Sequence, residues 1–235
     1  MIAILKRELR SYFYSPIGYI FIGFFLLLSG FFFAGINLNN RITNMKYIFG
    51  NLTTIFLFLT PILTMRLIAE EKNSKTDQLL LTSPVNLTGI VFGKFFAALS
   101  VFVAALLITG IYPIIIIALK GNPPMGEILG AYLGFFLLGM SFISIGMFIS
   151  ALTENQLISA IATFGTLLIL FIINWISGIF KSPIIATVID WLSVVKRFDD
   201  FSGGLLGVRP VLYYLSFTAI FVFLTIRALE SRRWS

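Results

Sequence analysis

Long uncharged, apolar runs alternate with short polar segments along almost the whole chain. Six such runs cover residues 17–36, 48–65, 95–119, 128–153, 155–180 and 210–226. An α-helix needs roughly 20 apolar residues to cross the hydrocarbon core of a bilayer, and about 17 is the lower limit. None of the runs alternates with the period of two that is typical of a membrane β-barrel. The pattern therefore predicts an all-α, polytopic membrane protein with six transmembrane helices.

The composition supports this class and excludes several others. Hydrophobic residues make up 58% of the chain and charged residues 11%, whereas globular domains have about 25% charged residues. We therefore expect residues 1–235 to form a single transmembrane domain. The chain has no cysteine and no histidine, which removes thiolate metal sites, disulfides and the usual general base. We predict no catalytic residue, no metal site and no cofactor in this chain.

The first 15 residues are polar enough to lie outside the bilayer, yet they carry an apolar period. Apolar residues recur at three- and four-residue spacing, opposite three basic ones: Ile2, Leu5, Leu9 and Phe13 against Lys6, Arg7 and Arg10. This pattern predicts an amphipathic helix in the headgroup plane, which Pro16 ends. A basic cytoplasmic tail is the alternative. A signal peptide is disfavoured because the following apolar run is too long and no A-x-A cleavage pattern follows it.

The distribution of Lys and Arg predicts the orientation of the six spans. With the N-terminus inside, 10 of these residues lie on the cytoplasmic side and 7 outside. Without the longest outer segment the ratio is 10 to 3, and cytoplasmic loops carry the excess of basic residues. Both termini are therefore expected in the cytoplasm. The net charge of +7 is interpreted as membrane anchoring, because no basic stripe interleaved with aromatic residues indicates nucleic-acid binding.

Two connections between spans have contrasting lengths. Residues 153–156 leave room only for a tight hairpin. Residues 181–209 are too long for a turn and too apolar for a solvated loop, and their apolar pieces, 183–189 and 191–195, are too short to span. We expect two short external re-entrant helices here, forming a cap between spans five and six. One long tilted helix from Phe180 through Val195 is the alternative.

Candidate polar sites inside the spans are few. Gln156, Thr163 and Asn174 could line a substrate pathway, although such residues more often tie membrane helices together. No ionisable residue lies in the middle of a run, which disfavours a proton relay. Residues 89–94 look like a phosphate-binding loop, but only three residues separate the glycines and Phe95 follows the lysine. That spacing excludes the motif.

The most polar segment, residues 66–94, contains seven of the 27 charged residues and carries a family resemblance. Its MRLIAEE stretch (65–71), Thr76 and its LLLTSPV stretch (79–85) resemble the signature of type-two ABC transporter permeases. The subgroup that includes the gliding-motility-associated and copper-processing accessory permeases is most similar. Further matches lie at residues 11–19, 153–156 and 224–234, so the resemblance extends over nearly the whole chain.

The resemblance implies a six-span permease of the prokaryotic plasma (inner) membrane. Two copies, or two related permeases, would join two separately encoded cytoplasmic ABC ATPase subunits, which would bind ATP and Mg. The first cytoplasmic loop would contain a coupling helix that docks on the ATPase. The residues implied in this contact are Glu70, Glu71, Thr76, Asp77, Leu79, Leu80, Leu81 and Pro84.

The loop fits this role in part. Ser74 and Asp77 have the spacing of a helix cap, Leu79 to Leu81 supply an apolar face, and Pro84 would end the helix. Lys75 and Gln78 depart from the Gly and Glu that the family commonly has. An ordinary solvated loop is the alternative interpretation.

These observations predict a transport permease without enzymatic activity of its own, embedded in the lipid bilayer and driven by its ATPase partner. Export is the expected direction, because no segment resembles a domain that receives cargo. The alternative is an ATPase-linked membrane scaffold or assembly factor without a defined solute. An intramembrane enzyme is disfavoured by the missing histidine, cysteine and mid-span carboxylates.

Overall fold

The computed structural model describes residues 1–40, 42–75, 86–176, 193–203 and 207–233, and every regular element in them is a helix. This confirms the all-α class. The helices are α1 (Ile2–Tyr14), α2 (Pro16–Phe32), η1 (Phe33–Leu38), α3 (Lys46–Thr64), α4 (Ala69–Asn73), α6 (Leu87–Ile108), α7 (Ile111–Ala118), α8 (Met125–Leu152), α9 (Gln156–Ile176), α11 (Lys196–Ser202) and α12 (Val208–Arg233).

Six helical segments of the described chain are long and apolar enough to cross a membrane, which confirms the predicted number. They are Pro16–Leu38, Lys46–Asn73, Leu87–Ala118, Met125–Leu152, Gln156–Ile173 and Val208–Ser231. The third begins eight residues before the predicted start at residue 95. Asn86 caps it by accepting a hydrogen bond from the Thr88 amide at 3.3 Å, and Lys94 continues the helix because acidic side chains neutralise its charge.

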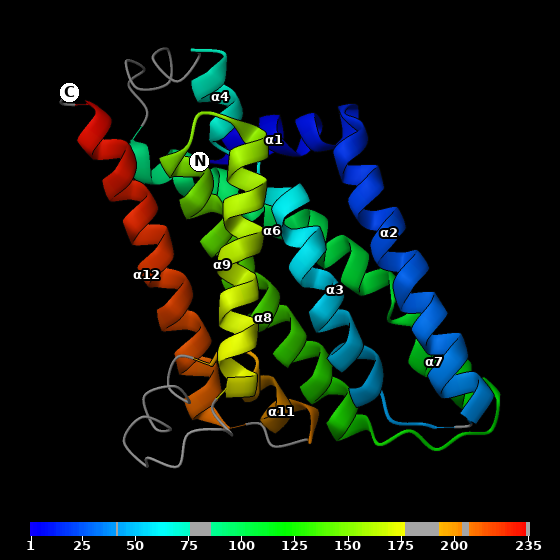
Figure 1. Ribbon diagram of the computed structural model, residues 1–235. Coiled ribbons are helices and arrows are strands. Elements are labelled where there is room, and N and C mark those ends of the chain that lie inside the picture. Colours follow the sequence, from blue (N-terminus) through cyan, green and yellow to red (C-terminus); the bar gives the residue numbers. More distant parts are fainter. Residues whose placement is uncertain (41, 76–85, 177–192, 204–206, 234–235) are drawn as a thin grey trace.

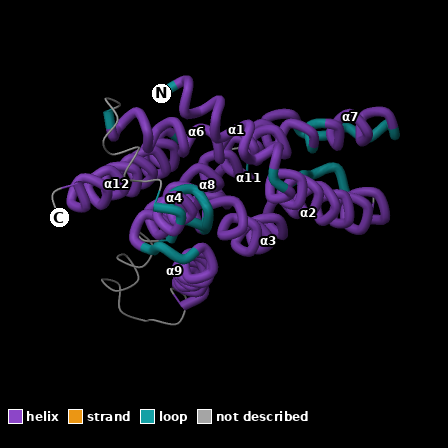
Figure 2. Tube along the Cα trace, turned by 90° about the horizontal axis from the view of Figure 1, so that it is seen from above, coloured by secondary structure: helices purple, strands orange, loops and turns teal. Residues whose placement is uncertain are grey.

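The long helices run side by side, and α1 crosses them at one end (Figure 1). Helix α8 is central: it packs against α3, α6, α9, α11 and α12. Seen end-on, α2 and α7 lie on one flank of α8 and α12 lies on the other (Figure 2). Both chain ends and α4 lie at the same end of the bundle as α1, as an even number of spans requires.

Phenylalanines from four spans form the centre of the bundle. Phe56 of α3 contacts Phe102 of α6 and Phe135 of α8, with ring centroids 4.8 and 5.5 Å apart. Phe25 of α2 joins them at 6.3 Å from Phe102. All four rings are fully buried. Edge-to-face and tilted contacts of this kind stabilise by about 0.5–1.5 kcal/mol beyond the buried area, so this cluster fixes how the four spans pack.

The connection between α8 and α9 confirms the predicted hairpin. Helix α8 ends at Leu152 and α9 begins at Gln156. The Asn155 side chain accepts a hydrogen bond from the Leu157 amide at 2.8 Å, which caps α9 and keeps the turn short.

The predicted external cap is corrected in part. Residues 183–189 lie outside the described residues. Residues 193–195 are not helical, which excludes both a helix at 191–195 and an unbroken helix through Val195. The short helix is α11 instead, where the Ser193 hydroxyl accepts a hydrogen bond from the Lys196 amide at 3.2 Å. Phe198 and Phe201 bury this charged helix against α8, a packing that charge counting along the sequence does not reveal.

Helices α3 and α8 approach each other closely where Gly146 of α8 faces Thr64 of α3. A Cβ atom at residue 146 would lie 2.7 Å from the Thr64 Cβ and closer still to its Oγ1. We expect Gly146→Ala to destabilise the protein by about 1–3 kcal/mol, the usual effect of overpacking. Gly165→Ala is the control, since nothing lies within 4 Å of its Cβ position. It should stabilise α9 by about 0.5–1 kcal/mol. Unfolding in detergent, followed by circular dichroism, measures both; equal effects would contradict this packing.

Candidate functional site: a charge cluster at the base of the first loop

Helix α1 has two apolar faces rather than one. Ile2 and Phe13 of the predicted stripe are 68% and 42% exposed, as expected for a face that contacts lipid. On another face, Ile4 and Tyr12 are buried in the bundle, with Glu8 between them at four-residue spacing. The helix itself is confirmed. It binds the rest of the protein through a face that includes a carboxylate.

Four charged side chains meet beneath this face. The Lys94 Nζ lies 3.1 Å from Glu8 Oε1 and 2.9 Å from Glu71 Oε2, and its side chain is only 3% exposed. Lys94 also donates a hydrogen bond to the Leu67 carbonyl at 2.6 Å. The Arg7 guanidinium closes the cluster at 2.7 Å from Glu8 and 2.5 Å from Glu71. The two positive and two negative charges balance, which makes their burial tolerable.

The charge state of the cluster follows from its geometry. Burial alone would raise the pKa of the Glu8 carboxyl, but the charges and hydrogen bonds of Lys94 and Arg7 outweigh burial and hold that pKa below its usual range. Glu8 is therefore ionised at neutral pH. Its pairing with Lys94 joins α1 to α6 across 86 positions of sequence.

A second set of contacts joins α1 to the end of α3. Arg66 pairs with Glu70 at 2.8 Å and donates hydrogen bonds to the Ser11 and Ser15 hydroxyls at 2.6 and 2.7 Å. The buried Tyr12 hydroxyl donates to the Leu63 carbonyl at 2.7 Å. These bonds place the start of the first loop directly against α1.

The short helix α4, which leads into the first loop, is also fixed to α8. The Ser150 hydroxyl accepts hydrogen bonds from the Ile68 and Ala69 amides at 3.1 and 3.0 Å, satisfying free N–H groups at the start of α4. Ser150 in turn donates to the Met65 carbonyl at 3.1 Å. The buried Lys72 ammonium donates to the Ala151 carbonyl. Polar groups of α4 thus contact α1, α6 and α8.

A comparison with known protein families shows which family this chain belongs to. A family model described as ABC-2 family transporter protein matches residues 35–225, well over half of the chain. The chain belongs to the ABC-2 transporter family. No curated protein matches it. Together with the six apolar helices, the family match makes this chain a multi-pass permease subunit of an ABC transporter.

In this ABC-2 permease the predicted coupling residues fall into two groups. Glu70 and Glu71 lie in α4 and form ion pairs within the chain. Glu70 pairs with Arg66, and Glu71 pairs with both Arg7 and Lys94. The others lie outside the described residues: Thr76, Asp77, Leu79, Leu80, Leu81 and Pro84. Ser74, the expected cap, is the last described residue but one before this gap. Its hydroxyl donates to the Glu70 carbonyl at 2.9 Å, at the end of α4.

The predicted pathway residues of the permease all lie on α9. Gln156 is half-buried at the start of α9, and Thr163 is fully buried two turns further along. The side chain of Asn174 lies outside the described side chains. The Thr163 hydroxyl has no hydrogen-bond partner within the described residues. The pathway therefore stays a prediction.

Sequence reasoning missed most of the cluster. Arg7, Glu8 and Lys94 are far from α4 in sequence, and no local motif joins them. Two signals were present: Glu8 is an acid among basic residues, and Lys94 is a single lysine between apolar stretches. A lone charge flanked by membrane sequence calls for a partner of opposite sign.

Proposed function

We propose that this permease is driven by a separately encoded cytoplasmic ABC ATPase that docks on residues 76–85, and that it works as an exporter. The anchoring of α4 supports the proposal most strongly. The loop departs from a helix whose charged side chains are held by α1 and α6 and whose backbone is held by α8. An ordinary solvated loop would leave these charges in water.

A base held in this way can transmit movement. Ion pairs with Lys94 and hydrogen bonds to Ser150 make α4 part of the same packed body as α1, α6 and α8. Displacement of the loop by an ATPase would therefore move these helices together, because packed elements shift between discrete arrangements rather than deform continuously. The apolar side chains of Leu79, Leu80 and Leu81 would form this chain's contact with the ATPase.

The remaining parts of the proposal follow the family resemblance. A second copy of this chain, or a related permease, would complete the transporter, with ATP and Mg bound on the ATPase subunits. Export is proposed because no segment between the spans of residues 1–235 resembles a domain that receives cargo. The membrane is proposed to be the prokaryotic plasma (inner) membrane, with both termini in the cytoplasm.

The proposal is tested by purifying the tagged permease from its native membranes. We expect a second polypeptide that hydrolyses ATP in a vanadate-sensitive manner, recovered in a fixed molar ratio to the permease. A folded, helical permease that brings no ATPase, under detergent conditions that preserve known transporter complexes, would contradict it.

The orientation gives a separate prediction. Single cysteines replacing Ser74 or Lys75 should react with an impermeant thiol reagent only after the membrane is opened, whereas cysteines replacing Asn122 or Lys196 should react from outside in intact cells. The chain has no native cysteine, so the background is clean. External labelling of Lys75→Cys would reverse the topology and remove the loop from any cytoplasmic ATPase.

A further inference from the structure

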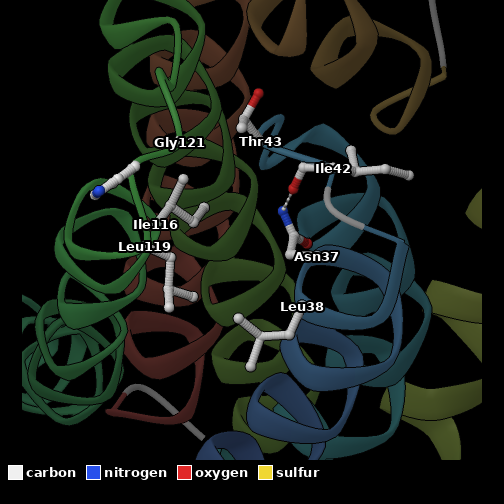
Figure 3. A pocket seen from close by; sticks show the side chains of 8 residues that line it. Asn37, Leu38, Ile42, Thr43, Ile116, Leu119 and Gly121 are labelled. Atoms are coloured by element: carbon white, nitrogen blue, oxygen red, sulfur yellow. Dashed lines mark hydrogen bonds between the residues drawn. The ribbon is translucent and has the colours of Figure 1, made fainter.

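A pocket lies between the first and third spans, at the end of the bundle away from α1 and α4 (Figure 3). It has a volume of about 580 Å³. One wall comes from the end of η1 and the turn after it, with Asn37, Leu38 and Thr43. The other wall comes from the end of α7, with Ile116, Leu119 and Lys120. Neither the charge cluster nor the proposed ATPase contact uses this pocket.

Lys120 adopts a conformation that its residue type disfavours. Helix α7 ends with the Gly121 amide bonded to the Ile116 carbonyl and the Lys120 amide to the Ile117 carbonyl, both at 2.9 Å. This motif usually has glycine at the left-handed position, but here Lys120 occupies it with φ 61°. A side chain in the left-handed region costs roughly 1–2 kcal/mol. The strained residue therefore lies in the lining of this pocket.

The cation at the pocket is available. Within the residues that the structure describes, Lys120 forms no ion pair. The nearby carboxylate of Glu127, in the first turn of α8, accepts a hydrogen bond from the Asn44 side chain at 2.5 Å. Lys120 is exposed and forms part of the pocket lining.

The opposite wall carries a second local cost. Asn37 is buried, and its Nδ2 donates hydrogen bonds to the Ile42 and Asn44 carbonyls at 2.7 and 3.2 Å. Its Oδ1 has no partner within the described residues, which costs about 1–3 kcal/mol. The wall is also built on η1, a π-helix, and π-helical turns are frequent at functional sites. Strained backbone and unsatisfied buried polar groups are often found at ligand-binding sites.

Apolar side chains on both walls of the pocket continue onto exposed apolar surface of α2 and α7. Leu38 and Leu119 are 40% and 65% exposed. Beyond them, α2 and α7 expose Phe31, Ile114 and Ile117, all within helices long and apolar enough to span. One charged end and one lipid-facing apolar end match an amphiphile rather than a soluble anion.

We propose that this pocket binds an anionic phospholipid, with its phosphate on Lys120 and its acyl chains along Leu38, Leu119 and the exposed faces of α2 and α7. A lysine near an anionic lipid surface contributes about 1 kcal/mol, which corresponds to about a five-fold preference for an anionic over a zwitterionic lipid. Bound at this junction, the lipid would hold the first and third spans together at their ends.

The test places a single fluorescent reporter at the pocket. Leu119→Trp is introduced after the three native tryptophans (Trp175, Trp191 and Trp234) are replaced by phenylalanine, and the protein is placed in phosphatidylcholine nanodiscs. Quenching by brominated phosphatidylglycerol is compared with quenching by brominated phosphatidylcholine. We expect about five-fold stronger association of phosphatidylglycerol, reduced to near equality by Lys120→Gln and by Lys120→Gly. Lys120→Gly also relieves the backbone strain, so misfolding would not explain a loss of the phosphatidylglycerol preference in this variant.

Lys75→Gly is the matched control, because Lys75 also has a left-handed backbone, with φ 55°, at the other end of the molecule. It should leave the preference unchanged. Equal quenching by the two lipids, or equal loss in the Lys75 and Lys120 variants, would overturn the proposal. Inorganic phosphate, at ionic strength matched with sodium chloride, should not reduce the preference; a reduction as large as that of Lys120→Gln would assign the site to soluble anions instead.

Discussion

Replacing Lys94 with methionine should destabilise the permease by about 3–5 kcal/mol, the usual cost of leaving a buried charge without its partner. Lys94 of α6 forms ion pairs with both Glu8 and Glu71. Without it, two carboxylates that are 13% and 18% exposed would lose the buried ammonium group between them. Unfolding in detergent, followed by circular dichroism, measures the loss.

Two variants separate this effect from a general loss of positive charge. Lys6→Met removes an exposed lysine from the same helix α1 and should change stability by less than about 0.5 kcal/mol. The triple variant Lys94→Met, Glu8→Gln, Glu71→Gln should recover most of the lost stability, because neutral groups of similar volume often replace a buried ion network without cost. A Lys94→Met variant as stable as Lys6→Met would show that the cluster does not hold α1 and α4.

The second large effect is expected at the proposed ATPase contact. Replacing Leu79 and Leu80 together with aspartate should abolish co-purification of the ATPase while leaving the permease folded. An unpaired carboxylate buried against an apolar partner surface costs several kcal/mol. Two such carboxylates should cost more than the free energy by which this contact binds the ATPase. The molar ratio of ATPase to permease after purification measures the effect.

The matched control adds the same charges beside the apolar triplet. Ser74→Asp with Lys75→Asp should retain most of the ATPase, because these side chains are exposed at the end of α4 and surface substitutions have small effects. Full retention of the ATPase by the Leu79 and Leu80 double variant would contradict docking through this face.

The number and order of the spans could be predicted because charge is scarce in this chain. A charge-free run of about 20 residues is nearly sufficient evidence for a spanning helix. The predicted start of a span was wrong where a charge is neutralised inside the protein. The charge-free run predicts a start at residue 95, yet Lys94 lies within α6 with Glu8 and Glu71 as partners. Pairing across the bundle is a tertiary property that a run of letters does not contain.

The same reason explains the errors at α1 and α11. The period of Ile2, Leu5, Leu9 and Phe13 predicts the helix α1, which the structure confirms. The face that binds the bundle contains Glu8 and is not apolar enough to be recognised in the sequence. Residues 196–202 contain no apolar run in the sequence, whereas Phe198 and Phe201 anchor them on α8. At the site, Arg66 lies four residues before its partner Glu70, whereas the partners of Glu71, Arg7 and Lys94, are distant in sequence.

Photo-crosslinking from the first loop tests the central claim most directly. A benzoylphenylalanine at Leu80, in native membranes, should crosslink the ATPase subunit, and the same residue at Asn122, at the opposite end of the bundle, should not. Equal crosslinking from both positions, or none from Leu80 in membranes where the ATPase co-purifies with the permease, would contradict coupling through this loop.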